Sequence, residues 1–191
     1  MTIDVPRQPG GIESLLTQAS ARAPAPVEQW NPPYCGDIGL KIGRDGTWYY
    51  QGSPIDRAQL VKLFASILRR DNDGQHYLVT PVEKVSVMVE DAPFLAVEME
   101  VQGSGRDQQL IFRTNIDDIV LCGPNNPMRF ALEPSSGGLK PYVLVRGQLE
   151  ALVTRSVYYD LMDLSGRCEA PDADGIWSGG QLFEFPKLGD L

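Results

Sequence analysis

Short runs of alternating apolar and polar residues fill the chain from Lys84 to Val153, and no other feature of the sequence restricts the fold as much. Side chains that alternate with a period of two belong to strands with one buried face. Turns rich in glycine and proline separate the runs at spacings of about 8–12 residues, which is typical of an antiparallel sandwich or barrel. The predicted strands cover residues 84–90, 94–101, 109–114, 119–121, 128–132, 142–145 and 149–153.

An amphipathic helix is predicted at residues 154–164, because Tyr158, Leu161 and Met162 recur on one helical face. A helix directly after the last strand would cap the barrel. We therefore expect residues 83–164 to form an antiparallel barrel or strongly bent sheet, with this helix packed on it and a tail behind it.

The region before residue 83 mixes strands with a helix. Residues 38–50 are expected to form a hairpin, since alternating residues flank an Asp45-Gly46 pair, which favours hairpin turns. Ser53 and Pro54 are preferred at helix starts, so a helix is predicted to begin there. A strand at 77–80 follows. The helix should expose three basic residues, Lys62, Arg69 and Arg70.

Two parts of the chain share an order of elements. Residues 38–81 and 142–186 both read as hairpin, helix, turn and strand, and both contain the tetrapeptide Asp-Gly-x-Trp. Matches this short also arise by chance, but they favour a duplication. The predicted fold is α+β, with two associated β-rich units that share a hairpin–helix–strand core. The expected parts are an N-terminal helix and proline-rich arm (1–33), a small α+β domain (34–82) and a barrel domain (83–191).

The charge of the chain is acidic and unevenly divided. Lys and Arg number 17 against 25 Asp and Glu, which gives a net charge of −8. Residues 1–80 are neutral, so residues 81–191 carry the whole excess. This balance disfavours a nucleic acid or an anionic membrane as partner. No apolar run reaches the length of about 18 residues that a membrane-spanning helix needs.

Cysteine and histidine are too few for most site chemistry. Cys35, Cys122 and Cys168 are widely spaced and odd in number, which suits a reducing compartment, so a cytoplasmic location is expected. The single histidine, His76, is not close in sequence to any of them. Neither a metal site nor a cofactor site is therefore predicted.

The sequence gives little support for a catalytic nucleophile with a histidine base or for a catalytic pair of carboxylates. His76 is expected at the solvent-facing start of a strand, and Cys35 is expected as a small buried residue. The acidic neighbours at 90–91 and 117–118 offer at most one ligand per pair, because neighbours on a strand point to opposite faces. They are predicted to be solvated loop ends, and no catalytic residue is assigned.

Six strings occur in an order that resembles a known family. They are CGDIGLKIGRDGTWYYQGSPI, LVKLFASILRRD, YLVTPVEKV, VEDAPF, FRTN and PYVLVRG. Together they resemble the bacterial family 1285 of domains of unknown function over residues 34–164. The resemblance implies an α+β fold with a duplicated core, a C-terminal part similar to a pleckstrin-homology barrel, and a binding groove between the two halves. It implies no established activity, and a role in signalling is conjecture.

One departure concerns phosphoinositides. Pleckstrin-homology domains that bind them use a basic loop near the first hairpin. Residues 85–94 contain Glu90 and Asp91 and no basic residue. A barrel with this loop is not expected to bind anionic lipid.

The candidate binding residues are polar or amphipathic residues at strand ends or on a hairpin face. A shared groove would gather them, although a structural ion network with Glu83, Asp91 or Asp118 as acidic partners is the competing interpretation. Core packing is the alternative for the two aromatic residues. The set is Trp48, Tyr50, Glu83, Asp91, Arg113, Asn115, Arg146 and Arg155.

Three function classes follow from these observations. The first is a non-catalytic binding or adaptor protein in bacterial signal transduction. Its groove between the two units would bind a protein segment or a small ligand. The second is an enzyme of unrecognised type that uses Cys35 or a carboxylate pair. The third is a nucleic-acid binder that uses the local patch of Lys62, Arg69 and Arg70.

Overall fold

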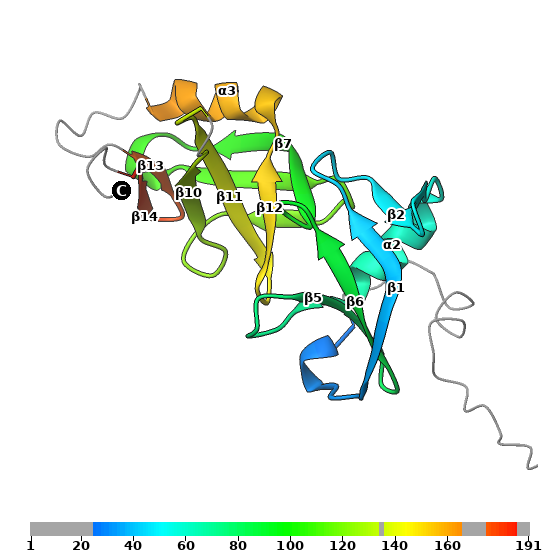
Figure 1. The fold of residues 1–191 in the computed structure, drawn as a ribbon. Helices are drawn as coiled ribbons and strands as arrows, with labels where there is room; N and C mark the ends of the chain where they lie inside the picture. Colours follow the sequence, from blue (N-terminus) through cyan, green and yellow to red (C-terminus); the bar gives the residue numbers. More distant parts are fainter. Residues whose placement is uncertain (1–24, 134–135, 166–174, 187–191) are drawn as a thin grey trace, which may run out of the picture. The chain divides into compact units, whose positions relative to one another are not determined.

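The computed structural model describes residues 25–133, 136–165 and 175–186, and the chain divides into two compact units after Glu90 (Figure 1). The helix expected within residues 1–33, Cys168 and Asp174 lie outside the described residues. Each unit is built on a curled six-stranded sheet and has few helices. The α+β fold class predicted from the sequence is confirmed.

The sheet of the first unit has the strand order β3-β2-β1-β6-β5-β4. Strands β1 and β6 are parallel, and the other neighbours are antiparallel. The 3-10 helix η1 (Val27–Gln29) precedes the sheet, and helix α2 (Ala58–Ser66) connects β3 to β4. The strands are β1 (Tyr34–Ile42), β2 (Trp48–Tyr50), β3 (Ser53–Pro54), β4 (Leu68–Arg70), β5 (His76–Val79) and β6 (Lys84–Val89).

The predicted hairpin is confirmed as β1 and β2, with Ile42 opposite Trp48. The Asp45 carboxylate accepts hydrogen bonds from the Thr47 N–H at 3.0 Å and the Thr47 hydroxyl at 2.8 Å, and these bonds lower the pKa of Asp45. One face of the sheet packs against α2, where the ring centroids of Trp48 and Phe64 are 6.1 Å apart. The hairpin thus carries the largest aromatic side chain of this core.

The helix predicted to start at Ser53 and Pro54 begins later and is shorter. Ser53 and Pro54 form β3, an edge strand paired with β2, where the missing N–H of proline costs no ladder bond. The helix begins at Ala58 and ends at Ser66. Residues 68–70, predicted as its last turn, form β4 and pair with β5. Pairing with neighbouring strands overrides the local start signal, because capping preferences are worth only about 1 kcal/mol.

Arg69 is buried, whereas the sequence predicted it to be exposed. Its guanidinium donates to the carbonyl oxygens of Val27 and Trp30, both at 2.7 Å, and to the Asp71 carboxylate at 2.5 and 3.2 Å. Burial by itself would raise the pKa of Asp71, but the hydrogen bonds from Arg69 and Lys84 lower it. Arg69 therefore fastens the segment around η1 to the sheet. The predicted basic patch is wrong, since its middle residue is inside the unit.

Strand β6 belongs to the first sheet, although the sequence assigned it to the barrel that starts at residue 83. It lies between β1 and β5 in Figure 1 and pairs with both. The first compact unit accordingly ends at Glu90 rather than at residue 82. Alternation identifies a strand, but it does not say which sheet the strand joins.

The sheet of the second unit has the order β10-β11-β12-β7-β8-β9 and curls into a half-barrel. Strands β12 and β7 are parallel, which corrects the expectation of an entirely antiparallel barrel. The predicted helix is confirmed as α3 (Arg155–Ser165), and it packs against β7. The strands are β7 (Phe94–Gln102), β8 (Gln109–Thr114), β9 (Ile119–Leu121), β10 (Met128–Leu132), β11 (Leu139–Arg146) and β12 (Leu149–Val153), with η2 (Gly105–Asp107) between β7 and β8.

The two sheets share one topology. If the strands of each unit are numbered one to six, both sheets have the order 3-2-1-6-5-4, with the first strand parallel to the sixth and the other neighbours antiparallel. A duplication is therefore present, but it relates residues 34–89 to residues 94–153, so the predicted match of 38–81 with 142–186 is wrong. The helix falls after the third strand in one unit and after the sixth in the other. The matching Asp-Gly-x-Trp strings lie at non-equivalent places and do not mark the repeat.

After the helix, the strand expected near residue 186 is confirmed as β14 (Gln181–Glu184). It forms a hairpin with β13 (Gly175–Ser178), and the hairpin packs near β8 and β10. The Ser178 hydroxyl donates to the Cys122 carbonyl at 2.7 Å and accepts from the Leu110 N–H at 2.9 Å. Ile176 and Phe183 are buried. The hairpin therefore supplies core residues that the six-stranded half-barrel does not provide by itself.

Candidate functional site

Strand β9 carries two exposed apolar side chains at an edge of the second sheet. Ile119 is 59% exposed and Leu121 is 57% exposed, whereas Val120 between them is buried. Within the described part of the chain, β9 pairs with β8 and has no strand on its other side. A sheet edge with exposed apolar residues is a ready template for an additional strand, and soluble proteins usually protect such edges.

The hydrogen bonds of β9 show which backbone groups face outward. The Thr114 N–H donates to the Asp118 carbonyl at 2.9 Å, and the Cys122 N–H donates to the Leu110 carbonyl at 2.9 Å. Backbone polar groups alternate along an antiparallel strand, so Asp118, Val120 and Cys122 face β8. The N–H and C=O groups of Ile119 and Leu121 therefore point away from the sheet, on the residues whose side chains are exposed.

The turn that positions β9 is tight and self-bonded. The Asp117 N–H donates to the Thr114 carbonyl at 2.9 Å, and the Asp118 N–H donates to the Thr114 hydroxyl at 3.0 Å. Asp117 has φ = 68°, a left-handed conformation that Asp and Asn tolerate better than most residues. Ile116 is buried under the turn. These contacts hold the start of β9 in place.

An ion network lies beside the apolar residues on the outer face. The Arg113 guanidinium donates to Glu98 at 2.5 and 2.7 Å and to Asp117 at 2.7 Å. These carboxylates raise the pKa of Arg113, and the hydrogen bond from Arg113 lowers the pKa of Glu98. Arg113 pairs with Ile119 across β8 and β9, and Ile111 pairs with Leu121. Glu100, opposite Ile111 on β7, adds a further carboxylate to this face.

The predicted site residues of the first unit have separate surroundings. Trp48 is 1% exposed, so core packing is correct for it and a groove wall is wrong. Its indole N–H has no hydrogen-bond partner among the described residues. Tyr50 is exposed at the end of β2. Glu83 lies in the turn between β5 and β6, where its N–H donates to the Thr80 hydroxyl at 3.1 Å. The structure therefore does not gather these three residues.

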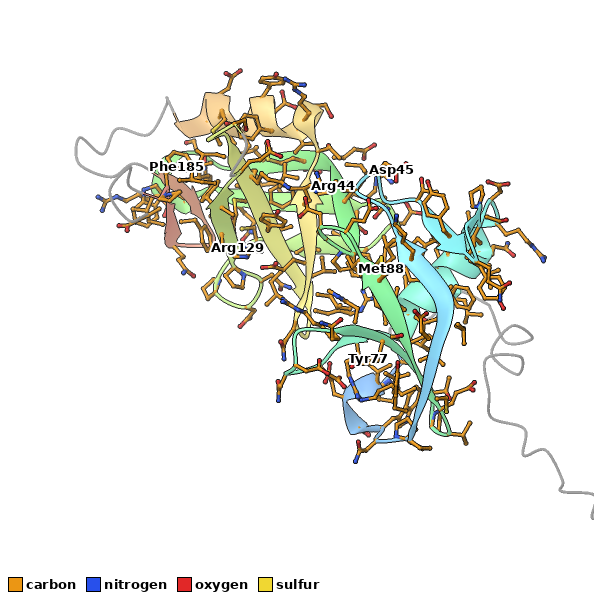
Figure 2. All side chains as sticks on the ribbon, viewed as in Figure 1. Arg44, Asp45, Tyr77, Met88, Arg129 and Phe185 are labelled. Atoms are coloured by element: carbon orange, nitrogen blue, oxygen red, sulfur yellow. The ribbon has the colours of Figure 1, made fainter. Side chains whose placement is uncertain are left out.

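Asp91 belongs to a polar cluster on β10, β11 and β12. Its carboxylate accepts a hydrogen bond from the Tyr142 hydroxyl at 2.7 Å and forms an ion pair with Lys140. Arg129, labelled in Figure 2, stacks on the Tyr142 ring at 4.2 Å and donates to Glu150 at 2.5 and 2.6 Å. Burial and the bond to Asp91 raise the pKa of Tyr142. Each of these charged groups has a partner, which favours a structural role.

The other predicted site residues of the second unit also have internal partners. The Asn115 side-chain oxygen accepts from the Leu95 N–H at 3.0 Å. Arg146 pairs with Asp118, an acidic partner that the ion-network interpretation predicted, and lies 5.0 Å from the Phe94 ring centroid. Arg155 donates to the Tyr159 hydroxyl at 3.2 Å. The groove between the two halves stays a prediction.

The acidic neighbours are ion-paired rather than merely solvated. Each of the four carboxylates forms an ion pair with a different cation. The pairs are Glu90 with Lys41, Asp91 with Lys140, Asp117 with Arg113, and Asp118 with Arg146. A pair of carboxylates that shares a proton or a metal ion needs converging groups. Among the described residues, no group of three or more His, Cys, Asp or Glu side chains could hold a metal ion.

Cys35 and His76 differ from their predicted surroundings. Cys35 is exposed rather than buried, and its thiol donates to the Pro33 carbonyl at 3.5 Å. His76 begins β5 as predicted but is half-buried. Burial, together with the charge of Arg70, lowers the pKa of His76 to about 4.

This shift predicts a pH dependence of stability. The unfolded chain binds a proton on His76 below about pH 6.5 and the folded chain only near pH 4, so acidification favours unfolding. Between pH 7 and pH 5 we expect a loss on the order of 1–2 kcal/mol from this group. Urea unfolding at both pH values measures it. His76→Gln should remove most of the difference, because ordinary carboxylates titrate lower; an unchanged difference contradicts the assignment.

Sequence reasoning identified 119–121 as a short strand but did not single it out as a site. The sequence signal for this strand is the apolar run Ile119, Val120 and Leu121, which lies between the acidic pair at 117–118 and the Gly-Pro pair at 123–124. Whether such a strand lies at an edge depends on the pairing of the whole sheet. Of the helices in the described ranges, none combines the length and apolar character needed to cross a membrane.

Comparisons with known proteins match both units. A model described as the N-terminal domain of a domain of unknown function (DUF1285) matches residues 25–92, and one described as the C-terminal domain of a protein of unknown function (DUF1285) matches residues 93–185. A solved DUF1285 family protein from Silicibacter pomeroyi is 49% identical, with a TM-score of 0.83 over 91% of this chain and 95% of that chain. One from Shewanella baltica is 32% identical, with a TM-score of 0.52 over 66% and 91%. The comparison with curated proteins finds no match.

Proposed function

This chain belongs to the DUF1285 family, and we propose that it is a non-catalytic binding protein whose second unit takes an extended segment of a protein partner. The partner segment adds to the outer edge of β9, which has no neighbouring strand among the described residues, as a further strand. Its backbone bonds to the outward N–H and C=O groups of Ile119 and Leu121. Its side chains alternate, and those on the outer face pack beside the two exposed apolar residues.

The observation that carries the proposal is the coincidence of two features on β9. The residues with outward backbone groups are also the residues with exposed apolar side chains. Backbone bonds supply affinity in strand addition, and side-chain contacts supply selectivity. An exposed apolar edge is an aggregation hazard unless a partner uses it, which favours a functional reason for its presence.

The remaining polar groups favour binding over catalysis. The carboxylate neighbours are each ion-paired, and His76 is half-buried with its pKa lowered to about 4, so it is a weak general base near neutral pH. An adaptor of this kind is suited to bacterial signalling in the cytoplasm, where reduced Cys35 and Cys122 would persist. The helix after the last strand of the second unit supports a pleckstrin-homology-like relationship, although the parallel pair of β7 and β12 departs from an antiparallel barrel.

Strand addition predicts that Leu121→Pro strongly weakens binding and leaves the fold intact. Proline removes an outward N–H and no bond to β8, so thermal unfolding should be nearly unchanged. A blocked peptide of alternating threonine and valine, titrated into the isotopically labelled full chain, should shift the amide resonances of Ile119 and Leu121. Leu121→Pro should weaken binding about tenfold or more, since a hydrogen bond and the close approach of the strand are both lost.

Two further variants complete this test. Leu121→Lys keeps the backbone N–H and adds a charge of the kind that protects sheet edges, so it should also weaken binding without unfolding the unit. Met88→Lys is the matched control, because Met88 is equally exposed but lies on β6, which is paired on both sides (Figure 2). Peptide shifts that miss β9, or binding equal in all variants, would refute strand addition.

A further inference from the structure

We propose that the segment taken by β9 is basic as well as apolar: it places two apolar residues beside Ile119 and Leu121, and a lysine or arginine two positions further along the same face. This inference rests on the strand addition proposed above and names the chemistry of the partner. It follows from the charges that surround the apolar pair and from the register that an added strand must adopt.

The outer face of β7, β8 and β9 carries an excess of negative charge. Glu98, Glu100 and Asp117 lie on or next to this face, and Arg113 is the cation placed among them. Among the described residues of this cluster, three carboxylates stand against one guanidinium, so negative charge is in excess. Residues 81–191 as a whole are acidic as well. A segment with positive charge is attracted to this face, and an acidic segment is repelled.

The strand ladder defines where the positive charge lies. Residues directly opposite in a ladder share a face, and every second residue along the added strand returns to that face. The two residues opposite Ile119 and Leu121 are therefore two positions apart and point outward. The next outward residue lies beyond the start of β9, next to the turn in which Asp117 and Glu98 hold Arg113. A long basic side chain at this position reaches the acidic end of the network.

A second copy of this chain fits the same edge less well. Two copies paired through β9 would bring together two units that each carry a negative excess. Their outer faces would place the Glu98, Glu100 and Asp117 clusters on a single continuous sheet. Like charges on neighbouring strands destabilise pairing, so the charge favours a different, basic partner.

The experiment compares three blocked peptides that differ at one outward position. Each alternates threonine with valine, and the outward valine that would lie beyond Ile119, next to Asp117, is kept, changed to lysine or changed to glutamate. In low salt, the lysine peptide should bind the full chain about tenfold more tightly than the glutamate peptide, with the valine peptide between them. Raising the ionic strength should reduce the difference, because the charges are exposed.

Asp117→Asn tests the position of the charge. Asparagine accepts the left-handed backbone of residue 117, so the turn should be kept. The variant should bind the lysine peptide about threefold more weakly and the valine peptide equally well. Asp160→Asn, which removes an exposed carboxylate from α3, is the matched control and should leave both affinities unchanged.

The outcomes separate the two proposals. If the valine peptide binds at β9 and lysine gives no advantage, the basic partner is wrong and strand addition stands. If no peptide shifts the β9 amides, strand addition itself is wrong. If the chain dimerises in solution and Leu121→Pro makes it monomeric, a second copy occupies the edge and the basic partner is overturned.

Discussion

Arg69→Ala is expected to cost about 3–5 kcal/mol of the free energy of unfolding of the first unit, the range for removing one partner of a buried ion pair. The substitution removes one of the two described cations that pair with Asp71 and leaves Lys84. It also removes the hydrogen bonds to the carbonyl oxygens of Val27 and Trp30. A buried hydrogen-bond acceptor that loses its donor destabilises the fold by its full desolvation free energy. Urea unfolding followed by amide exchange in β4 and β5 measures the loss.

Two control variants test the role of Arg69. One keeps its positive charge without the guanidinium group, and the other removes a neighbouring arginine. Arg69→Lys keeps the charge but cannot reach two carbonyls and a carboxylate at once, so it should recover only a small part of the loss. Arg70→Ala removes a neighbouring arginine that donates an exposed 3.3 Å hydrogen bond to the Gly74 carbonyl, and it should change stability little. If Arg69→Lys is as stable as the parent, the buried fork does not anchor the η1 segment.

Phe94→Ala is expected to destabilise the second unit by about 3–5 kcal/mol, the usual cost of truncating a buried phenylalanine. Phe94 is fully buried at the start of β7 and pairs with Ala151 across the parallel contact with β12. Its ring also lies under the Arg146 guanidinium. The substitution leaves a cavity at the strand pair that joins the two halves of the sheet, where both neighbours are fixed by pairing and relax little.

The control for Phe94 is a truncation of the same kind on the surface. Leu121→Ala removes an exposed apolar side chain from β9 and should change the unfolding free energy by less than about 0.5 kcal/mol. Phe94→Leu keeps most of the volume and should cost clearly less than alanine. Urea unfolding of all three variants gives the comparison, and equal losses for Phe94→Ala and Leu121→Ala would show that Phe94 is not a core residue.

Local pattern was a good guide where the chain pairs with its own neighbour. The β1–β2 hairpin followed from alternation on both sides of Asp45-Gly46, and α3 followed from the spacing of Leu161 and its neighbours. Both elements close over a short stretch of chain, so their signals are local. The prediction of a helix start at Ser53 was wrong. The local capping signal competes with pairing to β2, and that pairing depends on the arrangement of the whole sheet.

The candidate site shows the same limit more sharply. The polar residues chosen from the sequence, such as Arg146 and Asn115, are engaged with partners far along the chain. The ion-network interpretation anticipated Asp118 as an acidic partner, because a half-buried arginine needs a counter-charge. Ile119 and Leu121 did not stand out, since exposure of an apolar residue cannot be known before the strand order is known.

The sequence by itself determined the α+β class and most of the strands, because side-chain alternation and turn residues act over a few positions. Only the tertiary structure decided that β6 closes the first sheet, that Arg69 lies inside, and that β9 is an edge with its apolar residues outward. Each of these depends on which distant strands pair. That choice is made by the burial of whole sheet faces and by the two parallel contacts, β1 with β6 and β7 with β12, which join residues far apart in the chain.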